Sequence, residues 1–361
     1  MIHRCWAEID LGALRHNAAV ARRRAGEGVD LLAVIKANGY GHGLTAVAKA
    51  LTNDVQLFGV ANLEEAIETR GVAAQPVLIL GPALPSERRK IVEHQFIPSI
   101  SSFEEAQQFS EVGAVAINFN IDTGMGRMGA GETEALVHLQ RIAALKNISL
   151  HSISTHLPAA DEDVVFTKEQ LQRFHALVRQ IRETIPGSYK IHASPSAGIL
   201  GYDTGAFDIV RAGLMLYGVS PAAQLPNDLR PALALKSRVV LLRDLPARSS
   251  ISYGRTFITQ HPTRVATLSI GYADGYPRAV SNRDAAVLIR GRRCAVLGRI
   301  TMDLMMVDVT NVTGVEIGDE AVLIGKEGDE EITAREVAER ASTIAWEIFT
   351  GIGSRVARVY L

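Results

Sequence analysis

Residues 31–43 read LLAVIKANGYGHG, a five-residue apolar run followed by a lysine and a glycine-rich turn. An apolar run this short, bounded by turn residues, is typical of a strand buried on both faces of a sheet. Amphipathic stretches such as 62–70 and 166–184 alternate with seven further runs: LFGVA (57–61), PVLIL (76–80), FIPSI (96–100), VAINFNI (115–121), SLHSIS (149–154), YKIHAS (189–194) and FDIVRAG (207–213). Eight alternations over about 200 residues predict an α/β fold, a closed (β/α)8 TIM-type barrel.

The pattern changes after Pro231, where apolar or alternating runs are separated by Pro, Gly, Asp and Asn turns. LALKSRVVLLRDL, RVATLSIGY, AAVLIRGRRCAVLG, LMMVDVT and EAVLI predict a second, mostly β domain. We therefore divide the chain into a barrel at 1–228 and a β-rich C-terminal domain at 229–361, with PAAQLPNDLRP (221–231) as the linker. An open doubly wound sheet remains the alternative, because the count of eight depends on the weak run at 207–213.

The composition favours a small-molecule partner over nucleic acid or a membrane. The chain has 361 residues, 47% of them hydrophobic, and a formal net charge of −1 with both signs interspersed, so no field of one sign attracts a polyanion. No apolar run approaches a membrane span, and charges occupy the N-terminal stretch where a signal peptide is apolar. The only cysteines, Cys5 and Cys294, form neither a disulfide framework nor a metal pattern. We expect a reducing, cytoplasmic location and no metal.

Lys36 stands directly after the first predicted strand, where burial would partly desolvate its ammonium group. Desolvation lowers the pKa of a lysine and supplies the neutral amine that Schiff-base formation needs, although a strand-end lysine can also extend into solvent. Polar side chains stand at the ends of four later strands: Arg127, His156, Ser196 and Arg211. The carboxyl ends of barrel strands meet at one rim, so these residues predict an active site there.

The string AVIKANGYGHG (33–43) resembles the pyridoxal-phosphate attachment signature of the alanine racemase family. IDTGMGRMG, STH, FDIVRAGLMLYG, SYGRTF, IGYADGYPR and GRITMDLMMVD resemble further motifs of that family, in its order and spacing, over nearly the whole chain. The resemblance implies an isomerase that interconverts L-alanine and D-alanine by a two-base mechanism on a pyridoxal 5'-phosphate aldimine. It would supply D-alanine for peptidoglycan.

The resemblance also implies the cofactor site. Lys36 would form the Schiff base, Tyr40 would contact the phosphate, and Arg211 would face the pyridine nitrogen. Because a guanidinium does not release its proton, that nitrogen would stay unprotonated, which favours racemisation over transamination. The structural alternative is an ion pair between Arg211 and Asp208. The remaining implied cofactor ligands are His156, Ser196, Gly213 and Leu214, the last two through their backbone.

Racemisation removes a proton from one face of the α-carbon and delivers one to the other, which two bases achieve together. The resemblance makes Lys36 one base and Tyr253 of the β-rich domain the other, reaching the site of a neighbouring subunit in a homodimer. Because a free tyrosine has a pKa near ~10, we expect positive charge beside Tyr253. The implied substrate ligands are Arg127, near the carboxylate, with Met302, Asp303 and Tyr272, although an isolated methionine is equally typical of a core. The resemblance also implies a substrate entrance like that of the family, formed by Tyr272, Asp274, Arg278, Arg299 and Asp161.

Two positions depart from the family pattern. Asn120 stands where many members carry a carbamylated lysine that steadies the arginine of the GMGRMG loop. An asparagine can hold Arg127 by its amide oxygen but brings no negative charge, so we expect no carbamate. Ser354 stands where several members have a tyrosine. Its shorter side chain suggests a broader alanine and serine racemase as an alternative.

Three other functions compete with this reading. Gly124, Gly126 and Gly129 fit GxGxxG, but no acidic residue lies at the distance that a nicotinamide dinucleotide site requires. A non-catalytic pyridoxal-phosphate carrier would lack the second domain. An amino-acid decarboxylase of similar architecture would carry a cysteine-centred motif in place of GRITMDLMM.

Overall fold

The computed structural model describes residues 3–203, 207–222, 224–225 and 228–361, and they form two compact units. The barrel unit contains the described residues of Ala13–Gly39 and Leu44–Arg230. The β-rich unit contains those up to Gly12, Tyr40–Gly43 and Pro231–Leu361. The boundary at 230/231 lies close to the predicted one at 228/229. Of the predicted linker at 221–231, residues 223, 226 and 227 lie outside the described residues.

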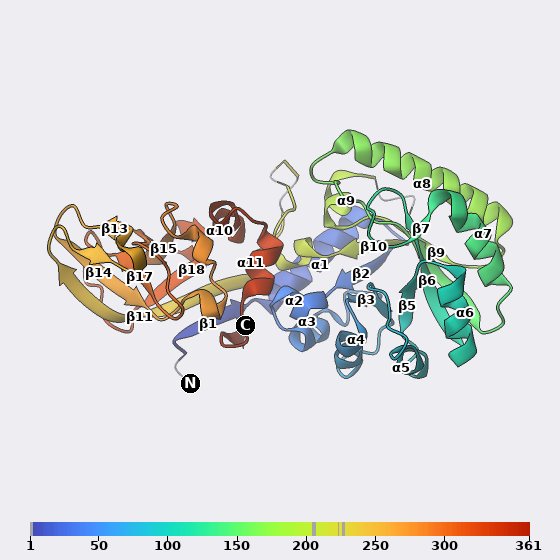
Figure 1. Ribbon diagram of the computed structural model, residues 1–361, viewed down its shortest axis with the longest axis horizontal. Coiled ribbons are helices and arrows are strands. Elements are labelled where there is room, and N and C mark those ends of the chain that lie inside the picture. The colour runs from blue at the N-terminus through green and yellow to red at the C-terminus, as the bar shows by residue number, and fades with distance from the viewer. Residues whose placement is uncertain (1–2, 204–206, 223, 226–227) are drawn as a thin grey trace. The chain divides into compact units, whose positions relative to one another are not determined.

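The barrel unit is built on eight parallel strands that coincide with the eight apolar runs of the sequence (Figure 1). Their order in the sheet follows the chain, with the last strand beside the first. They are β2 (Asp30–Val34), β3 (Leu57–Val60), β4 (Val77–Ile79), β5 (Ile97–Ile100), β6 (Val115–Asp122), β8 (Ile148–Ser154), β9 (Lys190–His192) and β10 (Ile209–Ala212). The short strand β7 (Ala130–Gly131) pairs with the end of β6.

Backbone hydrogen bonds join the two ends of this sheet. The Asp208 N–H donates to the carbonyl of Ile191, and the Arg211 N–H donates to the carbonyl of Ser194, each at 2.9 Å. β9 and β10 therefore lie side by side and the sheet closes. The predicted (β/α)8 barrel is confirmed, and the open doubly wound alternative is wrong.

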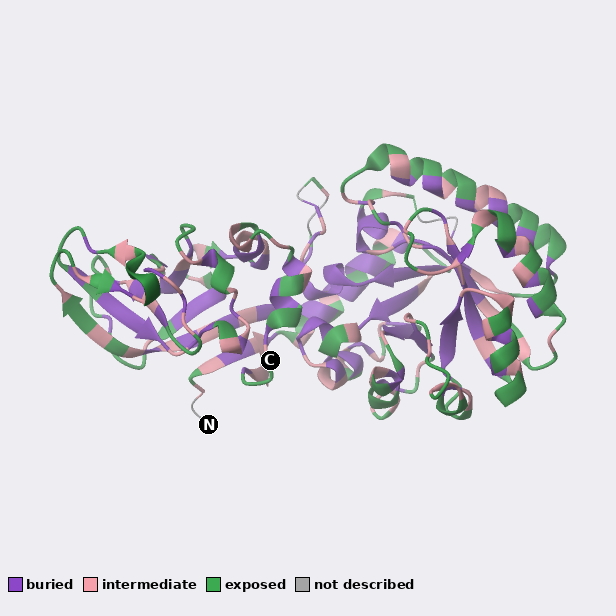
Figure 2. Ribbon diagram, in the orientation of Figure 1, coloured by how far each residue is buried: buried purple, intermediate pink, exposed green. Residues whose placement is uncertain are grey.

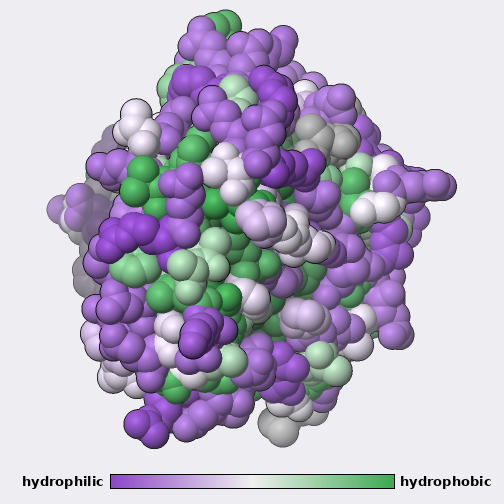
Figure 3. Space-filling view, turned by 90° about the vertical axis from the view of Figure 1, so that its right-hand side faces the viewer, coloured by the Kyte–Doolittle hydropathy of each residue, from purple (hydrophilic) through white to green (hydrophobic). Residues whose placement is uncertain are grey.

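Amphipathic helices cover the outside of the barrel strands, each with an apolar face toward the sheet and a polar face toward solvent. In Figure 2 the strands are buried while the helices are exposed on their outer sides. Figure 3 shows mostly hydrophilic residues on one face of the molecule, with hydrophobic ones gathered toward the middle of the view. The helical segments are α1 (Leu11–Ala25), α2 (Lys36–Tyr40), α3 (Leu44–Leu51), α4 (Leu63–Arg70), α5 (Arg88–Glu93), α6 (Phe103–Val112), α7 (Glu132–Ala143), α8 (Val164–Thr184), α9 (Ser196–Gly201) and the 3-10 turn η1 (Leu214–Tyr217). Of these, α2, α9 and η1 are short segments that do not follow the amphipathic pattern. No helix in the described ranges combines the length and apolar character of a membrane span.

The β-rich unit is organised around β11 (Leu233–Leu245), whose residues alternate between buried and partly exposed along its first half. This period of two is typical of a sheet with one face packed against a core. β11 pairs with β1 (Cys5–Ile9), β14 (Thr263–Leu268) and β18 (Glu320–Glu327). The other elements are β12 (Ser250–Ile251), β13 (Phe257–Ile258), β15 (Ala286–Ile289), β16 (Arg292–Ala295), β17 (Met305–Asp308), β19 (Glu330–Ile332), β20 (Ala357–Tyr360), α10 (Ala334–Ala341), α11 (Ala345–Gly351), η2 (Tyr253–Arg255), η3 (Tyr272–Asp274) and η4 (Arg278–Val280).

The N-terminal segment differs from the predicted division, which placed all of 1–228 in the barrel. β1 runs antiparallel to β11 and parallel to β20, with Trp6 opposite Lys236 on one side and Ala357 on the other. Strand pairing of this kind satisfies the backbone groups of residues 5–9 from both edges. The first strand of the chain therefore belongs to the β-rich unit.

Asn17 of α1 fastens the last segment of the barrel unit. Its buried side chain donates from Nδ2 to the carbonyls of Leu216 (2.9 Å) and Arg230 (2.8 Å). Its Oδ1 accepts the N–H of Arg230 at 2.8 Å. One amide thus satisfies three backbone groups of a segment that has no strand partner at these points.

We predict that Asn17→Ala lowers the free energy of unfolding by about 2–4 kcal/mol, because it leaves buried backbone groups without hydrogen bonds. The control is Arg15→Ala, an exposed position on the same helix, for which a change within about 0.5 kcal/mol is expected. Urea unfolding of both variants measures the difference. Equal stability of the two would show that Asn17 does not fasten this segment.

Candidate active site

Lys36 begins a left-handed turn at the carboxyl end of β2. The next four residues, Ala37, Asn38, Gly39 and Tyr40, have φ values of 53°, 54°, 60° and 52°. An L-residue other than glycine pays roughly 1–2 kcal/mol for this conformation, so the turn needs external support. The sequence signal for it was the glycine-rich string, which marks a turn but does not predict this handedness over several residues.

The support comes from Glu65 of α4. Its Oε1 accepts the N–H groups of Ala37 (2.7 Å) and Asn38 (3.4 Å), and its Oε2 accepts the N–H of Ala61 (2.8 Å). The Asn38 side chain in turn accepts the N–H of Leu44 at 2.9 Å. The turn after β2 is thereby tied to the residue that follows β3.

Burial lowers the pKa of the Lys36 amine, as expected from its position. The positive charge of Arg127 lowers this pKa further, while the carboxylate of Glu65 raises it. A lysine with a lowered pKa carries more neutral amine at neutral pH, which is the form that attacks a carbonyl group. The prediction of a partly desolvated lysine is confirmed.

Arg127 lies on the loop between β6 and β7, which is folded by one carboxylate. Asp122 accepts the N–H groups of Gly124 (2.9 Å) and Met125 (2.8 Å) at Oδ1, and that of Gly126 (2.8 Å) at Oδ2. In a dinucleotide site these N–H groups would hold phosphate oxygens. Because a carboxylate already occupies them, the structure speaks against the nicotinamide alternative.

Two side chains of α8 brace the same loop. The Arg173 guanidinium donates to the carbonyl of Thr123 at 2.7 Å. The fully buried Gln170 amide donates to the hydroxyl of Thr123 (2.7 Å) and to the carbonyl of His156 (2.9 Å). Gln170 therefore connects the start of the Arg127 loop to His156, two residues after β8.

Arg211 of β10 is buried, and its guanidinium is surrounded by neutral acceptors. It donates to the carbonyls of Thr155 (2.8 Å) and Ala193 (3.0 Å), to Nδ1 of His192 (2.5 Å) and to Nδ1 of His156 (3.1 Å). The alternative ion pair with Asp208 is absent from the described residues, since Asp208 pairs with Arg182 at 3.2 Å. Burial, with the charge of Arg127, lowers the pKa of Arg211 to about 10.

A network of amides and hydroxyls inside the barrel orients His192. Asn118 Oδ1 accepts from Nε2 of His192 (3.1 Å) and from the hydroxyl of Ser152 (2.9 Å), while its Nδ2 donates to Ser99 (3.1 Å). Because Asn118 Oδ1 is an acceptor only, Nε2 of His192 carries the proton and Nδ1 is left to accept from Arg211. The network thus passes from β5 through β6, β8 and β9 to the guanidinium in β10.

Asn120 takes part in this network and does not hold Arg127. Its Oδ1 accepts from Nδ2 of Asn118 (3.2 Å) and from the hydroxyl of Ser154 (2.5 Å). The Arg127 side chain is exposed and makes no hydrogen bond or ion pair within the described part of the chain. The expected contact between Asn120 and Arg127 is therefore wrong, because the interior network uses the amide oxygen.

His156 is nearly buried between the cationic groups of this rim. Burial lowers its pKa to about 3, and the charges of Arg211, Arg127 and Lys36 act in the same direction. His156 is therefore neutral near pH 7, with Nδ1 accepting from Arg211. Arg211 contacts His156 directly, and the charges of Arg127 and Lys36 act on the same imidazole.

Ser196 and the turn after β10 form a group of hydrogen-bond donors beside that cluster. The Ser196 hydroxyl accepts the N–H groups of Gly213 (3.0 Å) and Met215 (3.2 Å), at the start of η1. Leu214 lies between them as the first residue of η1. With its oxygen engaged by two donors, the hydroxyl directs its own hydrogen outward, which suits binding of an anionic oxygen.

The rim carries a surplus of positive charge. Within the described residues, no carboxylate forms an ion pair with Lys36, Arg127 or Arg211. Cations brought together without acidic partners repel one another, and an anionic ligand removes that repulsion. A ligand with a phosphate and a carboxylate would fit this site.

The remaining predicted residues, apart from Asp161, lie in the β-rich unit and are considered there alone. Tyr40 is buried, which raises its pKa to about 12 and keeps its phenol protonated. Tyr253 and Met302 are 69% and 53% exposed, so the apolar-core reading of Met302 is wrong. Asp303 is paired with Arg355 at 2.8 Å, and Arg355 also pairs with the buried Asp274 at 3.2 Å.

The segments around Tyr272 and Met302 are held together by backbone hydrogen bonds. The Tyr272 N–H donates to the carbonyl of Thr301 (3.1 Å), and the Ala273 N–H donates to that of Met302 (3.0 Å). A side chain at Gly271 would collide with those carbonyls, its Cβ lying 2.3 Å from each oxygen. Of the other entrance residues, Arg278 and Arg299 lie in this unit and Asp161 in the barrel unit.

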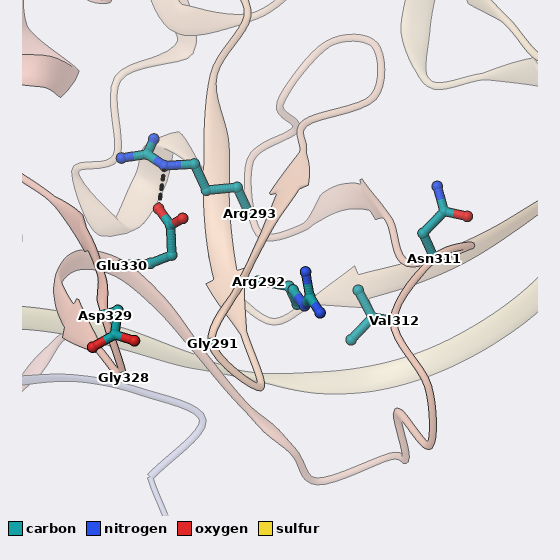
Figure 4. A pocket seen from close by; sticks show the side chains of 8 residues that line it. All are labelled: Gly291, Arg292, Arg293, Asn311, Val312, Gly328, Asp329 and Glu330. Atoms are coloured by element: carbon teal, nitrogen blue, oxygen red, sulfur yellow. Dashed lines mark hydrogen bonds and ion pairs between the residues drawn. The ribbon is translucent and has the colours of Figure 1, made fainter.

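A surface hollow elsewhere in the β-rich unit contains none of the predicted residues. It lies between the β15–β16 and β18–β19 turns, and Figure 4 shows its side chains. Arg293 at its edge is already paired with Glu330 (2.8 Å) and Glu336 (2.7 Å). We assign no function to this hollow. No cluster of potential metal ligands occurs in the parts of the chain that the structure describes.

Comparison with known proteins matches this arrangement. Residues 9–221 match the family model "Alanine racemase, N-terminal domain", and residues 232–360 match "Alanine racemase, C-terminal domain". The alanine racemase of Halothermothrix orenii is 39% identical over 98% of this chain and 96% of its own length. The chain belongs to the alanine racemase family.

Solved structures of alanine racemases have the same fold. The enzyme of Bacillus anthracis with bound L-Ala-P superposes with a TM-score of 0.92 at 31% identity, covering 100% of this chain and 96% of the other. The enzyme of Bartonella henselae with covalently bound pyridoxal phosphate gives 0.89 at 27% identity, covering 100% of both chains.

Sequence reasoning about this alanine racemase family member did not find several residues that shape the site: Glu65, Asn118, Asp122, Gln170 and His192. His192 lies within the YKIHAS run and Asp122 within IDTGMGRMG, so both stand in strings that the sequence singles out. Gln170 and Glu65 lie on amphipathic helices, where a polar residue ordinarily indicates a solvent-facing position.

The buried neutral histidines make stability depend on pH. Burial, with the charge of Arg211, also lowers the pKa of His192 well below its ordinary value. The unfolded chain therefore binds more protons than the folded one as the pH falls through about 6.5. The stabilisation is complete above that pH and is lost below it, toward the folded-state pKa.

We predict that each of His156 and His192 contributes a loss of about 1.4 kcal/mol of unfolding free energy between about pH 7.5 and about pH 5.5. His192→Gln, which keeps one donor and one acceptor, should reduce the pH-dependent loss by that amount. His261→Gln, at an exposed position, is the control. Urea unfolding at the two pH values measures the losses, and an undiminished loss in His192→Gln would contradict the prediction.

Proposed function

We propose that this chain is a pyridoxal-phosphate-dependent racemase that interconverts L-alanine and D-alanine. The observation that carries the proposal is the cationic rim of the barrel, where Lys36, Arg127 and Arg211 lie around a neutral His156 without an acidic ion-pair partner. Family membership supplies the reaction class. The named complexes of the relatives with pyridoxal phosphate and L-Ala-P agree with the anionic groups that this rim would bind.

The residues present fit this cofactor. The Ser196 hydroxyl and the backbone N–H of Leu214 would hold its phosphate at the start of η1, with the protonated phenol of Tyr40 as a further donor. The Gly213 N–H, which donates to the Ser196 oxygen in this structure, would be shared with the phosphate. The amine of Lys36, with its lowered pKa, would hold its aldehyde carbon. When bound, pyridoxal phosphate supplies an electron sink that makes the α-hydrogen of an amino acid acidic.

Arg211 would direct that chemistry toward racemisation. Its guanidinium would donate a hydrogen bond to the pyridine nitrogen without giving up a proton. The acceptors that surround Arg211 are histidine nitrogens and carbonyls, so no neighbouring carboxylate is placed to protonate the ring. An unprotonated ring withdraws less electron density from the α-carbon and limits protonation at other carbons. This keeps the reaction at the α-carbon.

We assign the two proton-transfer roles to Lys36 and Tyr253. Lys36 would hold or release a proton at Nζ on one face of the α-carbon, and the Tyr253 phenol oxygen would do so on the other face, from a partner subunit. Arg127 would bind the substrate carboxylate. The Arg299 guanidinium lies beside Gly254, where a Cβ would come within 2.8 Å of Nη1. In this proposal Arg299 would be the positive charge that acts on the neighbouring Tyr253.

The homodimer is part of this proposal. Tyr253, Met302, Leu304 and Tyr272 are exposed large side chains of one unit, with exposures of 69%, 53%, 39% and 42%. Exposed side chains of this kind are typical of surfaces that contact another protein. A second copy of the chain as the partner would bring Met302, Asp303 and Tyr272 toward its neighbour's substrate.

Reduction with borohydride should fix pyridoxal phosphate on Lys36, because the lowered pKa makes its amine the reactive one. Lys36→Ala should bind no cofactor covalently and racemise no alanine. Lys49→Ala, at an exposed position on α3, should behave as wild type. Peptide mapping by mass spectrometry identifies the modified lysine, and attachment at any other residue would refute the assignment.

Tyr253→Phe should keep the cofactor but reduce net racemisation by roughly 10²–10⁴-fold, the usual contribution of one acid–base group. One enantiomer of alanine should still exchange its α-hydrogen with solvent deuterium, through the base that remains. Tyr189→Phe, which removes a phenol in the barrel unit, is the control. Circular dichroism and proton NMR measure the two processes, and equal loss of exchange for both enantiomers would contradict a two-base site. If wild type attaches pyridoxal phosphate but racemises no amino acid, the result supports the non-catalytic carrier. If wild type also racemises serine, the result supports the broader racemase that Ser354 suggests.

A further inference from the structure

We propose that Glu65 is a positioning residue for Lys36, holding the left-handed turn that presents its amine and setting the local charge with its carboxylate. The inference rests on the proposed function, because it assumes that Lys36 is the residue on which the cofactor is held. Glu65 itself does not touch the reacting atoms. It acts on the lysine through the backbone of residues 37–38 and through space.

The helix that carries Glu65 fixes its place. Asn62, two residues after β3, caps α4 by accepting the N–H of Glu65 at 3.0 Å. The Thr69 hydroxyl donates to the Glu65 carbonyl at 2.7 Å. The side chain is half-buried, and both its oxygens are engaged by backbone N–H groups. A side chain with this anchorage sits in one place relative to the ends of β2 and β3.

The donor set calls for a carboxylate. Three N–H groups, those of Ala37, Asn38 and Ala61, converge on the two oxygens of Glu65. A glutamine has only one oxygen, so its NH2 group would face the N–H of either Ala37 or Ala61. An aspartate keeps the charge but is shorter by one methylene group and cannot reach both strand ends. Comparison of the two substitutions therefore separates the effect of the carboxylate charge from the effect of side-chain length.

Glu65 is the only acidic group among the charges that face Lys36 in the described barrel unit. The other charge is that of Arg127 from the β6–β7 loop, and the neutral His156 after β8 also responds to the charge of Lys36. Burial and Arg127 lower the pKa of Lys36, and Glu65 opposes them. Without this carboxylate the pKa of the amine falls further, while the turn that aims the amine loses its support.

The test compares Glu65→Gln and Glu65→Asp with Glu64→Gln, an exposed glutamate on the same helix. The first readout is competitive acetylation of Lys36 by acetic anhydride across pH, in the full chain freed of cofactor. The second is the rate at which each protein attaches added pyridoxal phosphate, followed by absorbance. Acetylation needs no cofactor, so it remains informative if the proposed function fails. If wild type attaches no pyridoxal phosphate to Lys36, the proposed function itself has failed.

Glu65→Gln should lower the midpoint of Lys36 acetylation by about 0.5 pH unit or more and slow attachment by about tenfold to a hundredfold. Glu65→Asp should leave the midpoint in place and slow attachment alone, and Glu64→Gln should change neither. An unshifted midpoint in Glu65→Gln, or equal effects of both Glu65 variants, would overturn the proposal. If Glu65→Gln does not fold, the test rests on Glu65→Asp alone. Attachment of pyridoxal phosphate by Glu65→Asp at the wild-type rate would then overturn the proposal.

Discussion

The site is governed by a buried guanidinium that has no carboxylate partner. A charge removed from water is costly unless its hydrogen-bond donors are met, and Arg211 meets them with carbonyl oxygens and histidine nitrogens. Neutral acceptors satisfy the donors but leave the charge uncancelled. That charge adds to burial in lowering the pKa of His156 and of His192, so both imidazoles are neutral near pH 7.

The residues expected to contact ligand and the residues that support them lie on different elements. The groups expected to meet ligand stand on strand ends and on the turns after them, where parallel strands bring them together. Their supports stand on helices or inside the barrel: Glu65 on α4, Gln170 and Arg173 on α8, and Asn118 on β6. Because most of these supports bond to backbone atoms, they fix the loops without competing for the ligand.

A feature of this fold can be predicted from the sequence when it depends on residues that are close together in the chain. The barrel strands could be predicted because each is a self-contained apolar run, and the rim residues because they follow those runs directly. β1 was misplaced because its partners stand more than 200 positions away, as in the pairing of Cys5 with Ser237. Asn120 was misjudged because its role depends on Ser154 and Asn118 inside the barrel. Glu65 and Gln170 belong to ordinary amphipathic patterns, and only contacts in three dimensions distinguish them.

The placement of β1 between β11 and β20 bears on how the chain is made. A ribosome produces residues 5–9 well before their two neighbouring strands, which arrive only with residues 233–245 and 357–360. The barrel segment in between can close as soon as β10 has emerged, since its strands pair in chain order. During that interval both edges of β1 are unpaired, which leaves this strand open to pairing with a foreign strand.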